Sequence, residues 1–212
     1  MKKIIITLLF AGTSLYSFSQ AQFALGIKAG PNFAKIDTDA SASANYDNRT
    51  GWHVGAFAQI RGEKFGFQPE VIFSQQGSKF KYNTNEPSLK QNFSYVNIPL
   101  IFKLYTIAGI NLQVGPQIGI LTSAKREDFV TGNSGPIRED DIKDDLKKTD
   151  ISLALGVGWD LPFGLTLHGR YNWGLTDNDD NGRRTNSGAP IGQIKNQVWQ
   201  ISVGYKLFKS GN

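Results

Sequence analysis

Strict alternation of apolar and polar side chains is the feature that most constrains what this chain can form. It is clearest over residues 95–121, which read as two long strands joined by a tight turn. A period of two places successive side chains on opposite faces of a sheet, so one face of this hairpin is aliphatic and the other carries amides, glycines and lysine. The aliphatic face is predicted to comprise Val96, Ile98, Leu100, Phe102, Leu104, Ile110, Leu112, Val114, Ile118 and Ile120.

The same alternation recurs in six further segments, which makes eight predicted strands in all. These six cover 23–34, 51–61, 65–76, 150–160, 163–175 and 196–208. Their connections alternate strictly between short turns and long polar loops, as they do in outer-membrane barrels with short periplasmic turns. The short turns are predicted at 62–64, 106–109 and 161–162, and the long loops at 35–50, 77–91, 123–149 and 177–195. The sequence therefore predicts an all-β fold, an eight-stranded antiparallel up-and-down transmembrane β-barrel with both termini periplasmic.

A soluble barrel of the lipocalin type has the same period but buries its apolar face around a ligand. Three observations favour an apolar face turned toward lipid instead. The polar face is rich in glycine, which suits a crowded interior. The strands are about 10–13 residues long, enough to cross a bilayer at a tilt. The apolar face also carries tryptophans near strand ends, as an interfacial girdle does: Trp52, Trp159, Trp173 and Trp199.

The first 21 residues have the composition of a cleaved signal peptide. Lys2 and Lys3 precede an apolar run over 4–11, and small residues follow up to a cleavage site after Ser19 or Ala21. The alternative is a membrane anchor, but the apolar run is too short to span about 30 Å of hydrocarbon. We therefore expect residues 1–21 to be removed and residues 22–212 to form one barrel domain.

Composition excludes several functional classes. The 212 residues contain no cysteine, so a disulfide scaffold, a thiolate metal site and a cysteine nucleophile are all absent. The formal charge of +5 falls to about +3 without the two lysines of the signal segment, too little to indicate a nucleic-acid partner. No cofactor is predicted.

Several motifs resemble a known family. The segment YVNIPLIFKL (95–104) is similar to the YLEIPLLLKY-type strand of the outer-membrane β-barrel family that includes PorT-like proteins. FALGIKAGPN (23–32), VGPQIG (114–119) and GRYNWGL (169–175) resemble its other strands, and the likeness covers nearly the whole mature chain. Asn97 stands where the family usually has an acid. The resemblance implies a small barrel in a Gram-negative outer membrane without assigned activity, and one branch of the family supports protein secretion.

The predicted polar face would line the barrel. Its charged and histidine side chains are Lys28, His53, Arg61, Glu70, Lys103, His168, Arg170 and Lys206. An eight-stranded barrel is filled by side chains, so these groups are predicted to form a buried network that satisfies its own charges. The alternative is a narrow porin biased toward anions, since Glu70 is the only acid counted among these cations.

An enzymatic role receives less support from the sequence. The chain has two histidines, and His168 is predicted inside the barrel with Thr166, Ser152 or Ser202 as neighbours. A barrel that modifies lipids needs its nucleophile and base on the outer face, beside the acyl chains. We therefore predict a protein without catalytic residues, and keep a lipid-modifying barrel enzyme as a remote alternative.

The predicted loops carry two further patterns. Residues 177–182 match the first half of a calcium-binding loop, but Gly188 replaces the glutamate needed at the twelfth position, so no metal site is predicted. Residues 125–150 mix both charge signs and read as a solvated external loop with room for a short helical turn.

The predicted partners follow from these regions. They are outer-membrane lipid, a surface or secretion partner bound by the external loops, and the barrel assembly machinery, whose terminal-strand signal the segment 202–208 resembles. Taken together, the sequence predicts an integral outer-membrane protein with a structural, interaction or secretion-support role.

Overall fold

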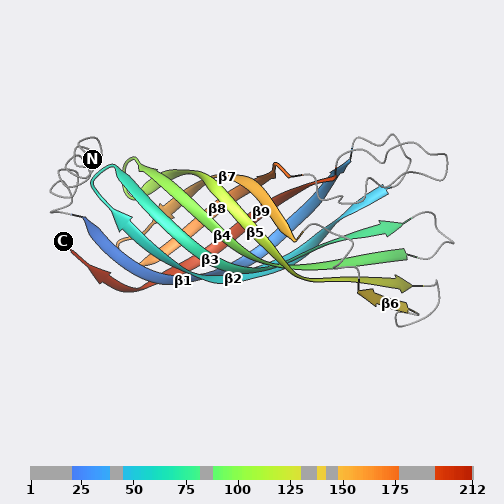
Figure 1. Cartoon of the computed structure of the whole chain (residues 1–212). Helices are drawn as coiled ribbons and strands as arrows, with labels where there is room; N and C mark the ends of the chain where they lie inside the picture. The colour runs from blue at the N-terminus through green and yellow to red at the C-terminus, as the bar shows by residue number, and fades with distance from the viewer. Residues whose placement is uncertain are drawn as a thin grey trace, which may run out of the picture.

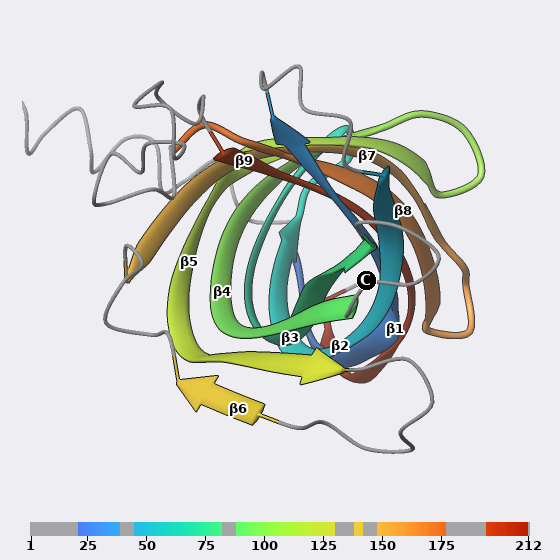
Figure 2. The same ribbon diagram turned by 90° about the vertical axis from the view of Figure 1, so that its right-hand side faces the viewer.

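The computed structural model describes residues 21–38, 45–81, 88–129, 138–141, 148–176 and 194–211, and these form one antiparallel sheet that closes into an eight-stranded barrel (Figure 1). Its strands are β1 (Gln22–Thr38), β2 (Asn45–Arg61), β3 (Phe65–Lys81), β4 (Ser88–Tyr105), β5 (Ile110–Phe129), β6 (Arg138–Asp141), β7 (Thr149–Asp160), β8 (Leu165–Gly174) and β9 (Ile194–Ser210). The strand β6 pairs only with β5 and lies outside the ring (Figure 2). The predicted up-and-down barrel is confirmed. Within the described part of the chain, no helix is long and apolar enough to cross a bilayer.

The barrel closes where β9 returns to β1. Phe23 lies opposite Ser210 and Thr38 lies opposite Ile194, so the first and last strands pair along nearly their whole length. The strands β5 and β7 pair directly, which completes the ring. Closure leaves no edge strand within the ring to pair with another chain. The start of β1, the end of β9 and the three short turns all lie at one end of the molecule (Figure 1).

The two faces of the barrel match the predicted alternation. Apolar side chains point outward, with Ile27, Leu112 and Trp199 exposing 50 %, 52 % and 59 % of their surface. The interior is mostly polar, although Ile72 and Ile101 are fully buried within it. A soluble barrel would show the reverse arrangement. The exposed apolar belt of this protein is therefore a surface suited to lipid.

The tryptophans lie on the outward face near the two limits of the apolar belt. Trp52 packs against Phe73 with ring centroids 5.6 Å apart, and Trp199 packs against Tyr171 at 4.9 Å. At the short-turn end, Nε1 of Trp159 donates to the backbone carbonyl of Ala108 at 3.0 Å. Amphipathic rings at these two levels suit the membrane–water interfaces.

Five strands extend well beyond the bounds that the sequence predicts. The strands β1, β3 and β5 continue into segments expected to be loops, and β2 and β4 begin earlier within them. Beyond the apolar belt a strand needs no lipid-facing side, so polar residues continue the backbone pairing without the alternation that marks a membrane strand. At the other end, β8 begins two residues later than predicted because Gly164 takes φ +94° in the turn.

The expectation of a short helical turn in 125–150 is wrong for the residues that the structure describes. Here β5 continues to Phe129, and β6 pairs with it antiparallel. In this register Lys125 lies opposite Asp141 and Asp128 lies opposite Arg138. Acidic residues are depleted in strands, so composition alone favoured a loop. Pairing with β5 overrides that weak preference.

Candidate functional site

Glu70 on β3 is the centre of the buried charges in the middle of the barrel. Arg170 on β8 donates to both of its carboxylate oxygens, at 3.0 Å from Nη1 and 2.9 Å from Nη2. Lys28 on β1 donates to Oε2 at 3.0 Å, and Gln68 donates to Oε1 at 2.7 Å. Arg170 also donates to the amide oxygen of Gln113 at 2.9 Å. We call these five side chains the Glu70 cluster. They join β1, β3, β5 and β8 across the lumen.

Asp160, the last residue of β7, is the centre of a second group near the short-turn end. Lys206 donates to its Oδ2 at 3.0 Å and Lys103 donates to its Oδ1 at 3.3 Å. The hydroxyl of Tyr105 and the amide of Gln59 also donate to Oδ2, at 2.9 and 3.0 Å. We call these five side chains the Asp160 cluster. Four donors surround this carboxylate, as burial of a charge requires.

One hydrogen bond joins the two clusters. The amide of Gln59 donates to the side-chain oxygen of Gln68 at 3.0 Å, so a continuous chain of contacts runs from Asp160 to Glu70. The prediction that Glu70 is the only acid on the polar face is wrong, because Asp160 lies on that face too. Asp160 shares the inward register of Gly156 and Gly158, two and four residues earlier, and that period could have identified it. The two clusters together hold four cations and two carboxylates.

His168 lies inside the barrel, as predicted, and faces Ser202 across the β8–β9 pair, but among the described residues it makes no hydrogen bond to Thr166, Ser152 or Ser202. Its Nδ1 accepts from the side-chain amide of Gln113 at 2.7 Å, which leaves the proton on Nε2. Nε2 has no partner among the described residues. A side-chain carbon at Gly158 would clash with the amide of Gln113, so only glycine leaves room for this contact.

The other histidine makes a hydrogen-bond chain that resembles a catalytic arrangement. Ser202 lies 2.8 Å from Nε2 of His53, and Nδ1 of the ring lies 2.8 Å from the side-chain oxygen of Asn32. That oxygen only accepts, so Nδ1 carries the proton and Nε2 accepts from the serine hydroxyl. The same order serves nucleophilic serines elsewhere. Here Asn32, His53 and Ser202 expose 0 %, 1 % and 2 % of their surface, so the chain is sealed from substrate.

In the half of the lumen toward the long loops, the side-chain contacts found among the described residues join amides and hydroxyls. Asn32 donates to Ser74 at 2.8 Å and Gln117 donates to Ser152 at 3.2 Å. Several buried polar atoms there have no partner among the described residues. They are Asn97 Nδ2, Gln117 Oε1, Gln200 Oε1 and both side-chain polar atoms of Asn172. Internal water is the usual partner of such groups.

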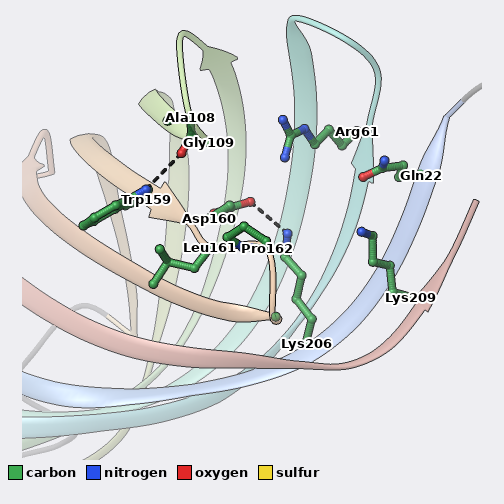
Figure 3. Close-up of a pocket in the computed structure, with 11 residues that line it drawn as sticks. Gln22, Arg61, Ala108, Gly109, Trp159, Asp160, Leu161, Pro162, Lys206 and Lys209 are labelled. Carbon is green, nitrogen blue, oxygen red and sulfur yellow. Dashed lines mark hydrogen bonds and ion pairs between the residues drawn. The ribbon is translucent and has the colours of Figure 1, made fainter. Parts of the chain in front are cut away.

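A cavity of about 440 Å³ opens at the short-turn end (Figure 3). We call it the mouth cavity, and it is lined by Gln22, Arg61, Ala108, Gly109, Trp159, Asp160, Leu161, Pro162, Gly164, Lys206 and Lys209. Asp160 thus belongs both to its cluster and to the wall of this cavity. Gly109, at φ +82°, shapes the rim, because its carbonyl accepts from the backbone N–H of Asp160 at 3.0 Å.

The structure places the eight predicted interior residues in three ways. Lys28, Glu70 and Arg170 meet in one cluster, and Lys103 and Lys206 meet in the other. The two histidines are buried in the lumen and bind amides and a hydroxyl, outside both clusters. Arg61 is only half-buried and belongs to neither cluster, since it ends β2 at the rim and stacks on the ring of Tyr105 at 3.9 Å. Arg61 thus keeps the inward face predicted for it, but it lies at the mouth of the barrel and outside the buried network.

No cluster of three or more metal-binding side chains occurs in the part of the chain that the structure describes. The calcium-like segment 177–182 lies outside that part. The predicted signal peptide also lies outside it, apart from Ala21.

Several solved structures are similar to this chain. Neisserial surface protein A has a TM-score of 0.52 at 11 % identity, with 86 % of this chain and 97 % of that one covered. The attachment invasion locus protein Ail of Yersinia pestis has a TM-score of 0.47 at 13 % identity, with 90 % of this chain and 99 % of that one covered. OprG of Pseudomonas aeruginosa has a TM-score of 0.43 at 13 % identity, with 91 % of this chain and 98 % of that one covered. At 11 % identity the likeness to neisserial surface protein A shows a shared fold and nothing more. No curated protein sequence matches the chain.

The family model for the outer membrane protein β-barrel domain matches residues 18–180. Because this match spans well over half of the sequence, the chain belongs to that family of outer-membrane β-barrel proteins.

Proposed function

We propose that this protein is a non-conducting, non-enzymatic barrel that serves a structural, interaction or secretion-support role in the outer membrane. The observation that carries the proposal is the filled lumen. The pairs Arg170–Glu70 and Lys28–Glu70 cross it in the middle, and the Asp160 cluster crosses it near the short-turn end. A solute would have to break fully buried ion pairs to pass, and breaking such a pair costs several kcal/mol.

The non-enzymatic part of the proposal is supported by the burial of both histidines. Neither imidazole faces the lipid-exposed surface, where an enzyme acting on acyl chains needs its base. We expect the wild-type protein and the Ser202→Ala variant to show the same background rate in an esterase and phospholipid-hydrolysis assay. A rate for the wild type that the variant loses would overturn this reading.

A narrow anion pore is the second candidate, and two observations favour it. The six charged side chains of the two clusters carry an excess of two positive charges. Partnerless amide atoms near the long-loop end offer sites that water could occupy. A hydrated path lined by excess cations would favour anions.

Planar-bilayer recording separates these candidates. We expect no stepwise conductance from the wild-type barrel, and none from Glu70→Gln, because the amide still fills the same space. Steps with anion selectivity in the wild type would establish the pore and overturn the proposal. The variant Arg170→Ala, which removes the largest fully buried side chain, serves as a positive control for opening the lumen.

Membership in the PorT-like branch, a periplasmic position of both termini and the predicted partners are part of the same proposal. The apolar belt suits outer-membrane lipid, and the end of β9 carries the pattern predicted for the barrel assembly machinery. Affinity purification from native membranes tests for a secretion or surface partner, and recovery of the barrel alone would leave a purely structural role. Protease digestion of intact cells, followed by detection of a tag placed after Asn212, tests the orientation. Loss of the tag in intact cells would contradict it.

A further inference from the structure

The mouth cavity differs from the rest of the interior in the charge that it leaves unpaired. Three cationic side chains line it, from Arg61, Lys206 and Lys209, with Asp160 as the acid in its wall (Figure 3). Asp160 is already held by Lys206 and Lys103. Among the described residues, Arg61 and Lys209 have no acidic partner. The cavity therefore presents two uncompensated positive charges.

Arg61 is held in place for binding although it has no hydrogen-bond acceptor among the described residues. Its guanidinium stacks on the ring of Tyr105 at 3.9 Å, and the hydroxyl of that tyrosine is fixed by its hydrogen bond to Asp160. Stacking occupies the face of the guanidinium and leaves its N–H edge free. A guanidinium edge of this kind can donate two parallel hydrogen bonds to an oxyanion, and holding it in advance lowers the entropy cost of binding.

The size and lining of the cavity indicate more than an inorganic ion. Its volume of 440 Å³ lies in the range of small-molecule pockets, about 300–1,000 Å³. Leu161, Pro162 and Trp159 form an apolar side opposite the cationic one, and Gln22 adds an amide. An organic ligand with one strongly anionic group and a less polar remainder matches this division.

We propose that the mouth cavity binds the phosphate group of an organic phosphate, with Arg61 and Lys209 as its main ligands and Lys206 as a third. Two free positive charges match a phosphate monoester, which carries a charge of about −1.5 to −2 at pH 7, better than a single carboxylate. A cleft lined by one sign of charge also raises the local concentration of anions. A phosphate group is available from a soluble phosphate monoester or, as a diester with a single negative charge, from a phospholipid headgroup at the rim. The site stands whether or not the lumen conducts.

The test uses the full-length barrel in non-ionic maltoside micelles without phosphate buffer. Glycerol 3-phosphate is titrated by calorimetry, and retained phosphatidylglycerol is counted by native mass spectrometry. The double variant Arg61→Gln/Lys209→Gln should weaken binding at least about tenfold, since losing one charged hydrogen bond costs roughly that factor. Arg61→Lys keeps the charge but loses the two-point hydrogen bonding of the guanidinium, so its affinity should lie between those of the wild type and the double variant. The matched control is Lys64→Gln, which removes a charge from a turn at the same end but outside the cavity.

Each result decides the proposal. Glycerol 3-phosphate binding that weakens in the double variant and not in Lys64→Gln supports a soluble organic phosphate. Phosphatidylglycerol retained by the wild type and the control, but lost from the double variant, supports a lipid phosphate. Absence of both kinds of binding, equal binding by the double variant, or succinate binding as tightly as glycerol 3-phosphate overturns it. Heat-modifiable migration on gels verifies that each variant is folded.

Discussion

The two buried carboxylates of this barrel have similar partners but different surroundings. Glu70 and Asp160 each accept from two cations, and Glu70 also accepts from one neutral group where Asp160 accepts from two. Glu70 lies in the middle of the lumen among side chains from four strands, whereas Asp160 ends a strand and forms part of the wall of the mouth cavity. The Glu70 cluster is closed on all sides, and the Asp160 cluster has one side that an external ion can approach.

The difference shows how one interior can serve two purposes. A closed cluster contributes rigidity and blocks passage, because its charges have no other partner to turn to. A cluster at an opening can exchange a partner for water or a ligand at smaller cost. We therefore assign a structural role to the Glu70 cluster, and place the proposed ligand site beside the Asp160 cluster.

The largest expected effect that tests this comparison comes from removing the charge of Glu70. Glu70→Gln leaves Arg170 and Lys28 buried without a carboxylate, which should lower the free energy of unfolding by about 3–5 kcal/mol. Asp160→Asn, the matched change, should cost about 1–3 kcal/mol because water can reach Lys206. Urea unfolding in lipid vesicles, followed by tryptophan fluorescence, measures both. Equal losses would remove the distinction between the clusters.

A smaller effect is expected from exchanging the two kinds of cation. Arg170→Lys loses the two-point contact with Glu70 and the bond to Gln113, and should cost about 2 kcal/mol in the same unfolding assay. Lys206→Arg keeps a single charged contact at the open end and should change the stability by less than about 0.5 kcal/mol. A larger loss for the second variant than for the first would reverse the assignment.

The smallest expected effect is a difference in salt dependence. Raising the ionic strength from about 0.1 M to about 1 M shortens the screening length from roughly 10 Å to roughly 3 Å, but only where ions can approach. The destabilisation by Asp160→Asn should therefore shrink by a few tenths of a kcal/mol, by roughly the size of a screened surface interaction. The destabilisation by Glu70→Gln should stay constant as the salt concentration rises. Equal shrinkage of both would show that salt reaches the middle of the lumen.

Much of this structure could be predicted from period-two patterning, because lipid on one side and a crowded polar lumen on the other impose it on every membrane strand. The facing of Lys28 and Lys103 followed directly from that rule. The rule fails at strand ends. Asp160 was missed there, and Arg61 shares the inward face but lies at the mouth of the barrel, outside the buried network. Beyond the membrane the alternation disappears, so β6 left no signal.

The partners of side chains across the lumen could not be predicted from the sequence, for a different reason. Alternation assigns a side chain to the inner face but not to a partner, since the partner depends on strand tilt and register around the ring. Arg170 and Glu70 lie on strands that are not neighbours, and no local spacing relates them. The Ser202–His53 contact, between β9 and β2, is of the same kind.

The span of the Glu70 cluster along the chain has a consequence for assembly. Glu70 meets Lys28 from 42 positions earlier and Arg170 from 100 positions later. A partly inserted chain that lacks β8 would hold this acid in the bilayer with its strongest partner missing. Entering the membrane strand by strand would therefore pass through a state with poorly compensated charge. We expect insertion and ring closure to be concerted, with the arrival of β8 and β9 as the step that commits the barrel to the membrane.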